Sequence, residues 1–263
     1  MTTRWIRATV AGLAIAVALT ACGDNGTGSP QAGASSSGVT GTITVFAAAS
    51  LTESFSQIGK DFETANPGAR VTFNFAGSSA LATQINQGAP ADVFASASPA
   101  TMKTVTDAGN GDGTPNTFVK NQLVIAVPKG NPKGITGLAD LTKPGVKVAL
   151  CAEQVPCGTA AKTALSAAKV SLTPVTLEQD VKAALSKVKL GEVDAALVYR
   201  TDAKAASSDV DGVEFPESAG AVNSYPIVVL KSAPNKTAAR AFVGYVLSSK
   251  GVAVLTNAGF QAP

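Results

Sequence analysis

Hydroxyl side chains stand at two points where the sequence pattern changes from strand to helix. Ser50 follows the apolar run 42–47, and Ser78 and Ser79 follow the alternating run 70–76. A helix N-terminus offers unpaired backbone N–H groups and the positive end of the helix dipole, which together attract an anion. The small neighbours and the hydroxyls make these two turns candidates for an oxyanion site.

Helix capping is the competing interpretation of these turns. Ser50 and Glu53 have the S-x-x-E spacing of a capping box, in which the serine accepts a hydrogen bond from the first turn and the glutamate reaches back. Taken alone, this motif favours capping. Two further helix starts are predicted at 156–158 and 180–181. Four helix N-termini facing one cleft would form an uncharged site that only donates hydrogen bonds, which suits a fully deprotonated oxyanion.

The composition excludes many enzyme classes. The 263 residues include no histidine, so Ser-His-Asp and Cys-His nucleophile systems and His-ligated metal sites are excluded. The formal net charge is +3, or about +1 without Arg4 and Arg7, which does not fit a nucleic-acid partner. A serine nucleophile with a lysine base is the remaining enzyme alternative, but no S-x-x-K spacing occurs at Ser50 or Ser78. We predict a protein that is not an enzyme and needs no cofactor.

The N-terminal segment has the parts of an export signal. Arg4 and Arg7 precede an apolar run, and the segment ends in Leu-Thr-Ala-Cys at Cys22. This ending resembles a bacterial lipobox, so residues 1–21 are predicted to be a signal peptide and Cys22 to carry the lipid anchor. An ordinary signal peptide is the alternative. Residues 22–40 read as a flexible tether, and the protein is expected on the outer face of the cytoplasmic membrane, attached through its lipid.

Two cysteines remain if Cys22 is acylated. Cys151 and Cys157 lie six positions apart in what would be an oxidising compartment, which favours a disulfide between them. Two free buried thiols are the alternative. The C-x5-C spacing without histidine is a poor zinc signal, so no residue is expected to ligate a metal directly.

The hydrophobic pattern predicts an α/β protein in which strands and helices alternate throughout. Residues 122–224 form a self-contained set between an N-terminal set and a C-terminal return, so we expect two lobes, each with a mixed, mostly parallel sheet flanked by helices. Lobe 1 is assigned to 41–121 and 226–263, and lobe 2 to 122–225, with hinges near 120–122 and 224–226. The predicted strands are 42–47, 70–76, 92–97, 122–128, 146–150, 171–175, 194–199 and 225–230.

Six segments carry a family resemblance. They are TVFAAASLTESF, FAGSSALATQINQGAPADVFASA, VPCGTAAKTAL, QDVKAAL, LVYRTDA and YPIVVL. In this order and spacing they resemble the periplasmic molybdate-binding proteins of ABC transporters, over nearly all of residues 41–263. The resemblance implies a type II periplasmic-binding-protein fold. It also implies a monomer that captures molybdate, or tungstate, between its lobes and delivers it to an ABC permease.

The resemblance also implies the binding residues. In that family, serine hydroxyls, backbone N–H groups and one tyrosine hydroxyl hold the anion. Cys157 stands where we would expect alanine, which would put the disulfide at the wall of the site. The carried-over set contains no carboxylate, although Asp180 is adjacent, and sulfate or another oxyanion is the alternative ligand. The positions that match are Ser50, Ser78, Cys157, Val181 and Tyr199, with Ser79 as a possible addition.

Overall fold

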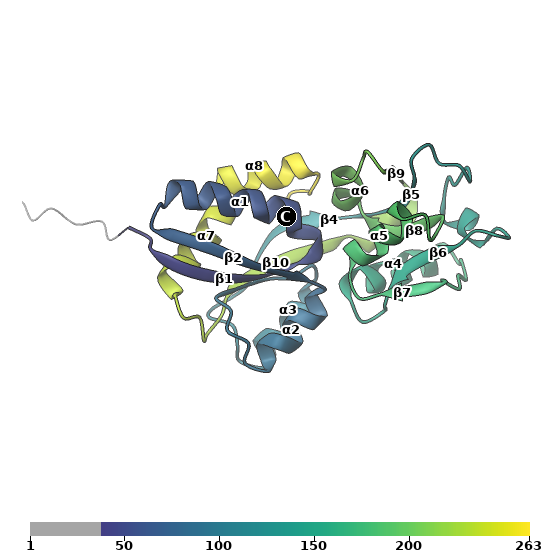
Figure 1. The fold of residues 1–263 in the computed structure, drawn as a ribbon. Helices are drawn as coiled ribbons and strands as arrows, with labels where there is room; N and C mark the ends of the chain where they lie inside the picture. The colour runs from purple at the N-terminus through teal and green to yellow at the C-terminus, as the bar shows by residue number, and fades with distance from the viewer. Residues whose placement is uncertain (1–37) are drawn as a thin grey trace, which may run out of the picture. The chain divides into compact units, whose positions relative to one another are not determined.

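The computed structural model describes residues 38–263. The predicted signal peptide, the predicted lipid-anchor residue Cys22 and most of the predicted tether lie outside the described residues. The described part contains two five-stranded sheets, each covered by its own helices (Figure 1). This arrangement confirms the predicted α/β class with two mixed sheets.

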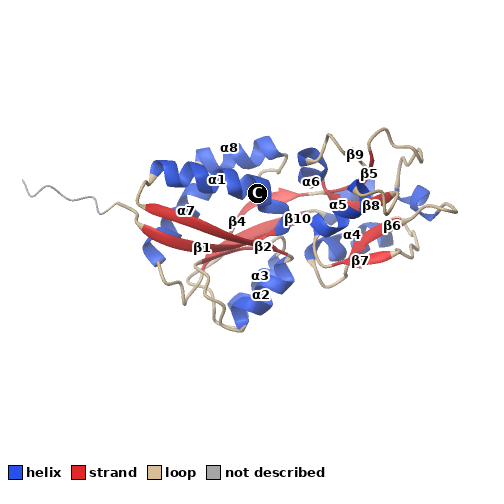
Figure 2. Cartoon of the chain, viewed as in Figure 1, coloured by secondary structure: helices blue, strands red, loops and turns tan. Residues whose placement is uncertain are grey.

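The first sheet has the strand order β2-β1-β3-β10-β4. β1 pairs in parallel with β2 and β3, whereas β10 runs antiparallel to β3 and β4. Figure 2 shows α1, α7 and α8 on one face of this sheet and α2 and α3 on the other. The elements are β1 (Gly41–Ala48), η1 (Ala49–Leu51), α1 (Thr52–Ala65), β2 (Ala69–Ala76), α2 (Ser78–Asn86), β3 (Val93–Ala95), α3 (Pro99–Asp107), β4 (Asn116–Asn121), β10 (Asn223–Val229), α7 (Lys236–Leu247) and α8 (Ser249–Ala258).

Both faces of the first sheet are apolar, which is why helices cover both. One face packs Phe55 and Phe62 of α1 against Phe242 of α7, and the other packs Leu81 of α2 against Met102 of α3. In the described part of the chain, no single helix is long and apolar enough to cross a membrane; α7 and α8 pass that test only as a pair bent by 58°.

The second sheet repeats the same arrangement with the order β7-β6-β8-β5-β9. β6 is parallel to β7 and β8, and β5 is antiparallel to β8 and β9. A continuous apolar core joins this sheet to its helices. The elements are β5 (Leu123–Pro128), η2 (Leu138–Thr142), β6 (Val148–Cys151), α4 (Pro156–Ala167), β7 (Thr176–Glu178), α5 (Val181–Lys189), β8 (Ala195–Tyr199), α6 (Arg200–Ala205), β9 (Val210–Val213) and η3 (Pro216–Ala221).

Three places differ from the sequence pattern. The strand expected at 171–175 does not form there; the chain is irregular over those residues, and β7 follows at Thr176–Glu178. The pattern does not predict β4 or β9, because β4 buries only a few apolar side chains, including Phe118 and Val119, and β9 contains an Asp-Gly pair. The chain passes between the sheets at Gln122 and again at Val222, since β10 begins at Asn223. The second passage therefore lies a few residues before the boundary expected at 225/226.

The shared topology positions the site. In parallel β-α units, each helix begins where its strand ends, so the helix N-termini gather at the carboxyl edge of the sheet. From the first sheet, β1 leads into η1 and β2 into α2; from the second, β6 leads into α4 and β7 into α5. Each lobe therefore contributes two helix starts.

Candidate anion-binding site

These four helix starts surround one small cavity. It encloses about 220 Å³ of space between atoms, part of which is open to solvent. All five positions implied by the resemblance lie around it: Ser50, Ser78, Cys157, Val181 and Tyr199. The rest of its wall is formed mainly by small or apolar residues: Ala48, Ala49, Gly77, Ala97, Val155 and Pro156.

Three of the helix starts at the cavity lack a side-chain cap. Ala48 precedes η1, Gly77 precedes α2 and Val155 precedes α4, and none of these makes a side-chain capping hydrogen bond. The helices α3, α7 and α8, which begin elsewhere, are capped by Ser98, Asn235 and Ser248. The first N–H groups of a helix have no partner inside the helix. At the cavity, these N–H groups can therefore donate hydrogen bonds to a bound ligand.

The predicted capping box at Ser50 is wrong. The chain turns into the 3₁₀ helix η1 before α1 starts, so Ser50 lies inside the helical segment and cannot cap it. Its hydroxyl instead lies 2.9 Å from the Tyr225 hydroxyl, and Glu53 pairs with Lys182 at 2.7 Å. Ser50 is therefore a cavity residue and not a cap.

The other two hydroxyls at the cavity, those of Ser78 and Tyr199, each accept a hydrogen bond from a neighbouring group. The Ala97 N–H donates to Ser78 Oγ at 3.0 Å, and the Asn223 side-chain amide donates to the Tyr199 hydroxyl at 2.7 Å. Ser78 and Tyr199 are both buried. Because their oxygens already accept a hydrogen bond, each hydroxyl still has its own proton to donate. For Tyr199, the candidate acceptors are the neighbouring Tyr225 hydroxyl and a group in the cavity. Burial raises the pKa of Tyr199 well above its usual value, so the phenol stays protonated.

Two acidic or hydroxyl side chains behave differently from the expectation. Ser79 does not lie around the cavity; its hydroxyl donates across the lobes to the Gln154 carbonyl at 2.6 Å. Asp180 does lie around the cavity, although no carboxylate was expected there. The physical reason is that Asp180 caps α5, accepting a hydrogen bond from the Ala183 N–H at 3.0 Å. The N-terminus of α5 lies at the cavity, so its capping residue lies there too.

Close backbone contacts depend on two glycines. A Cβ on Gly77 would lie 2.3 Å from the carbonyl oxygen of Gln179, which belongs to the other lobe. A Cβ on Gly158 would overlap the carbonyl of Ala152. The predicted disulfide between Cys151 and Cys157 is confirmed, and it closes the loop that leads into α4 beside the cavity.

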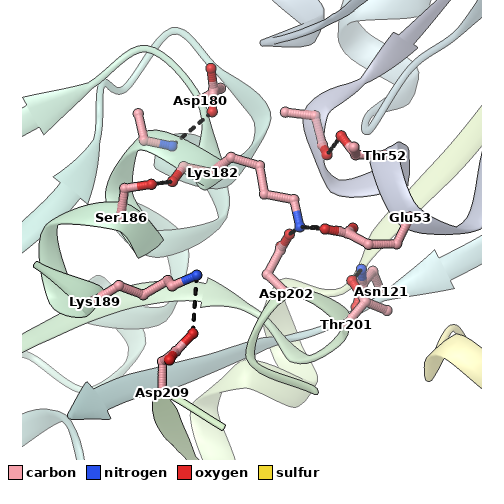
Figure 3. A network of polar contacts seen from close by, with 12 residues as sticks. Thr52, Glu53, Asn121, Asp180, Lys182, Ser186, Lys189, Thr201, Asp202 and Asp209 are labelled. Carbon is pink, nitrogen blue, oxygen red and sulfur yellow. Dashed lines mark hydrogen bonds and ion pairs between the residues drawn. The ribbon is translucent and has the colours of Figure 1, made fainter. Parts of the chain in front are cut away.

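A group of three charged side chains, one of them fully buried, lies near the site (Figure 3). Lys182, in the first turn of α5, pairs with Glu53 of α1 at 2.7 Å and with Asp202 of α6 at 3.0 Å. Asp202 is fully buried, and neither of its oxygens accepts a hydrogen bond of good geometry. Burial raises the pKa of Asp202 to about 6 even though Lys182 acts to lower it. Burial alone would lower the pKa of Lys182, but the two carboxylates together raise it.

We expect Asp202 to make stability depend on pH. Because its folded-state pKa is raised from 3.8 to about 6, the folded protein binds this proton more tightly than the unfolded chain does. The stabilisation is fully present below the unfolded-state pKa and is lost as pH rises through the folded-state pKa. Relative to Asp202→Asn, the wild-type free energy of unfolding should fall by about 3 kcal/mol across that window.

Urea unfolding of both proteins at pH values from about 4 to 8 measures this effect. The difference between the two free energies of unfolding should decrease steadily with pH and level off above the raised pKa. A difference that does not change with pH would show that Asp202 titrates normally.

Comparisons with known proteins agree with this geometry. Residues 43–261 match the family model described as bacterial extracellular solute-binding protein. The chain is similar to the molybdate-binding protein ModA of Mycobacterium tuberculosis, with 47% identity over 93% of each chain. Among solved structures, it resembles the periplasmic molybdate-binding protein of Azotobacter vinelandii, with a TM-score of 0.71, 22% identity, and coverage of 84% of this chain and 99% of that one.

The sulfate-binding protein SubI of M. tuberculosis has the same fold, with a TM-score of 0.72, 21% identity, and coverage of 84% of this chain and 86% of that one. At such identities a solved structure is informative about the fold alone. The family match and the 47% identity extend over most of the sequence, including every segment that reaches the cavity. The chain therefore belongs to the family of bacterial extracellular solute-binding proteins.

Proposed function

We propose that this protein binds molybdate in the cavity between its lobes and delivers it to an ABC-transporter permease. The observation that carries the proposal is the convergence of Ser50, Ser78, Cys157, Val181 and Tyr199, from five separate segments, on one small cavity. The 47% identity to a relative named as a molybdate-binding protein supports this choice of anion. Tungstate has the same shape and charge and nearly the same size, so it is expected to bind as well.

Neutral donors are sufficient to hold such a dianion. Three hydroxyls and the N–H groups of the uncapped helix starts surround the cavity, and none of the residues around it in the described range 38–263 is a lysine or arginine. A hydrogen bond to a charged group contributes about 1.5–3 kcal/mol. Five to seven such bonds together contribute about 8–21 kcal/mol, compared with the roughly 8–12 kcal/mol of a micromolar to nanomolar complex, and the upper part of that range offsets desolvation of the anion and closure of the lobes.

A thermal-unfolding panel tests the proposal. Molybdate or tungstate at 1,000 times its Kd should stabilise the protein by about 4 kcal/mol, whereas sulfate and phosphate should act far more weakly. Sulfate is the informative control, because it has the same charge and geometry but a smaller size. Equal stabilisation by all four anions, or by none, would contradict the proposal.

Asp180 gives a second test of the ligand's protonation state. Asp180 lines the cavity, and a negative charge at this position repels a dianion, so Asp180→Asn should tighten molybdate binding several-fold. Asparagine is also a good N-cap, so α5 should keep its cap. A ligand that carries a proton, such as hydrogen phosphate, would lose an acceptor in the same variant and bind more weakly. Isothermal titration calorimetry with both anions distinguishes these outcomes.

The cellular setting belongs to the same proposal. Export, attachment through a lipid on Cys22, and action as a monomer beside a membrane permease fit a family of extracellular solute-binding proteins. Metabolic labelling with a radioactive fatty acid should mark the wild type but not Cys22→Ala. Equal labelling of both proteins would contradict the anchor.

A further inference from the structure

A half-buried amide lies directly behind the Tyr199 hydroxyl. Asn223 Nδ2 lies 2.7 Å from the Tyr199 hydroxyl oxygen, 2.8 Å from the Ala97 carbonyl oxygen and 3.4 Å from the Pro156 carbonyl oxygen. Backbone carbonyls can only accept hydrogen bonds, so these two contacts fix which end of the amide is the NH₂ group. The Tyr199 oxygen must therefore be the acceptor in its contact with Asn223.

This contact determines which hydrogen bond the Tyr199 hydroxyl can make inside the cavity. Tyr199 has one proton to donate, and its oxygen already receives a hydrogen bond from Asn223. Its one proton is therefore available to a second partner, either the neighbouring Tyr225 hydroxyl or an acceptor inside the cavity, which Tyr199 borders. We propose that Asn223 is a positioning residue that holds Tyr199 as a hydrogen-bond donor toward the bound anion. This inference rests on the proposed oxyanion-binding function.

The strand that carries Asn223 supports this role. Asn223 begins β10 in the first sheet, whereas Tyr199 ends β8 in the second, so the contact joins the two lobes (Figure 1). Two residues further along β10, on the same side of the strand, the Tyr225 hydroxyl contacts Ser50 Oγ at 2.9 Å. One strand therefore backs two of the three hydroxyls at the cavity. Ser224, between them, points to the opposite side.

A double-mutant cycle tests whether Asn223 acts through Tyr199. Calorimetry would measure molybdate affinity for wild type, Asn223→Ala, Tyr199→Phe and the double variant. Asn223→Ala should bind about tenfold more weakly than wild type, because one charge-assisted donor is no longer oriented. In the Tyr199→Phe background, the same substitution should change the affinity less than twofold. The matched control Ser224→Ala should bind as wild type does.

A merely structural role would give a different pattern. If Asn223→Ala weakens binding equally with and without the Tyr199 hydroxyl, or does not weaken it at all, the positioning role is overturned. Asn223→Ser provides a milder second variant, and the unfolding temperature without ligand shows that each variant is folded. A wild type that binds no oxyanion overturns both proposals, whereas binding with additive losses overturns this inference alone.

Discussion

Gly77→Ala should lower the affinity for molybdate by about 100-fold or more. The added Cβ would lie 2.3 Å from the Gln179 carbonyl oxygen, whereas ordinary contact begins near 3.4 Å. Both partners are backbone, so the clash is relieved only if the lobes separate locally. Separation would draw the N-terminus of α5 away from that of α2, and the hydrogen bonds that both helices make to one anion could no longer form together. A 100-fold loss corresponds to about 2.8 kcal/mol.

Calorimetry should show this loss while the unfolding temperature without ligand stays close to that of wild type. Small-angle scattering should show less compaction on adding ligand than for wild type. Gly220→Ala is the matched control, because a Cβ at Gly220 meets no atom within 4 Å. Wild-type affinity in Gly77→Ala would mean that the bound form does not keep these two backbones in contact.

Ser78→Ala should also weaken binding by about 10- to 100-fold, for a different reason. The substitution removes a buried donor to the anion, which contributes about 1.5–3 kcal/mol. It also leaves the Ala97 N–H without the acceptor that it has in Ser78 Oγ. An orphaned buried donor costs about 1–3 kcal/mol, so the ligand-free protein should be destabilised too.

Calorimetry and urea unfolding measure these two effects separately. Ser186→Ala is a suitable control, since Ser186 is exposed and bonds only within its own helix, to the Lys182 carbonyl. Loss of stability with unchanged affinity would place Ser78 in the supporting structure and not in contact with the ligand.

The sequence predicted the parts of the site that depend on local pattern. A strand that ends in small residues and hydroxyls before a helix is visible at Ser50 and at Ser78, and both turns reach the cavity. The distinction between Ser78 and Ser79 was not predictable, because neighbouring helix positions point about 100° apart and the helix rotation is set by packing. The prediction also left Asp180 out of the site. The sequence does not show that the residue capping α5 lies at the cavity wall.

The supporting residues could not be found from local pattern. Asn223 and Tyr225 reach the hydroxyls of Tyr199 and Ser50 only because β10 returns to the first sheet and passes between β3 and β4. The one available signal was Tyr225 itself, because a tyrosine within an apolar strand usually needs a hydrogen-bond partner when it is buried. The prediction of a capping box at Ser50 was wrong because the sequence motif gives no sign of the 3₁₀ turn before α1.

The uncapped helix starts around the cavity have a consequence for the ligand-free protein. Omitting an N-cap costs about 0.5–2 kcal/mol, and η1, α2 and α4 all omit it. A bound oxyanion would serve as a shared cap for these segments. Without it, their first turns should fray, so amide hydrogens there should exchange quickly with solvent deuterium and become protected when the anion arrives.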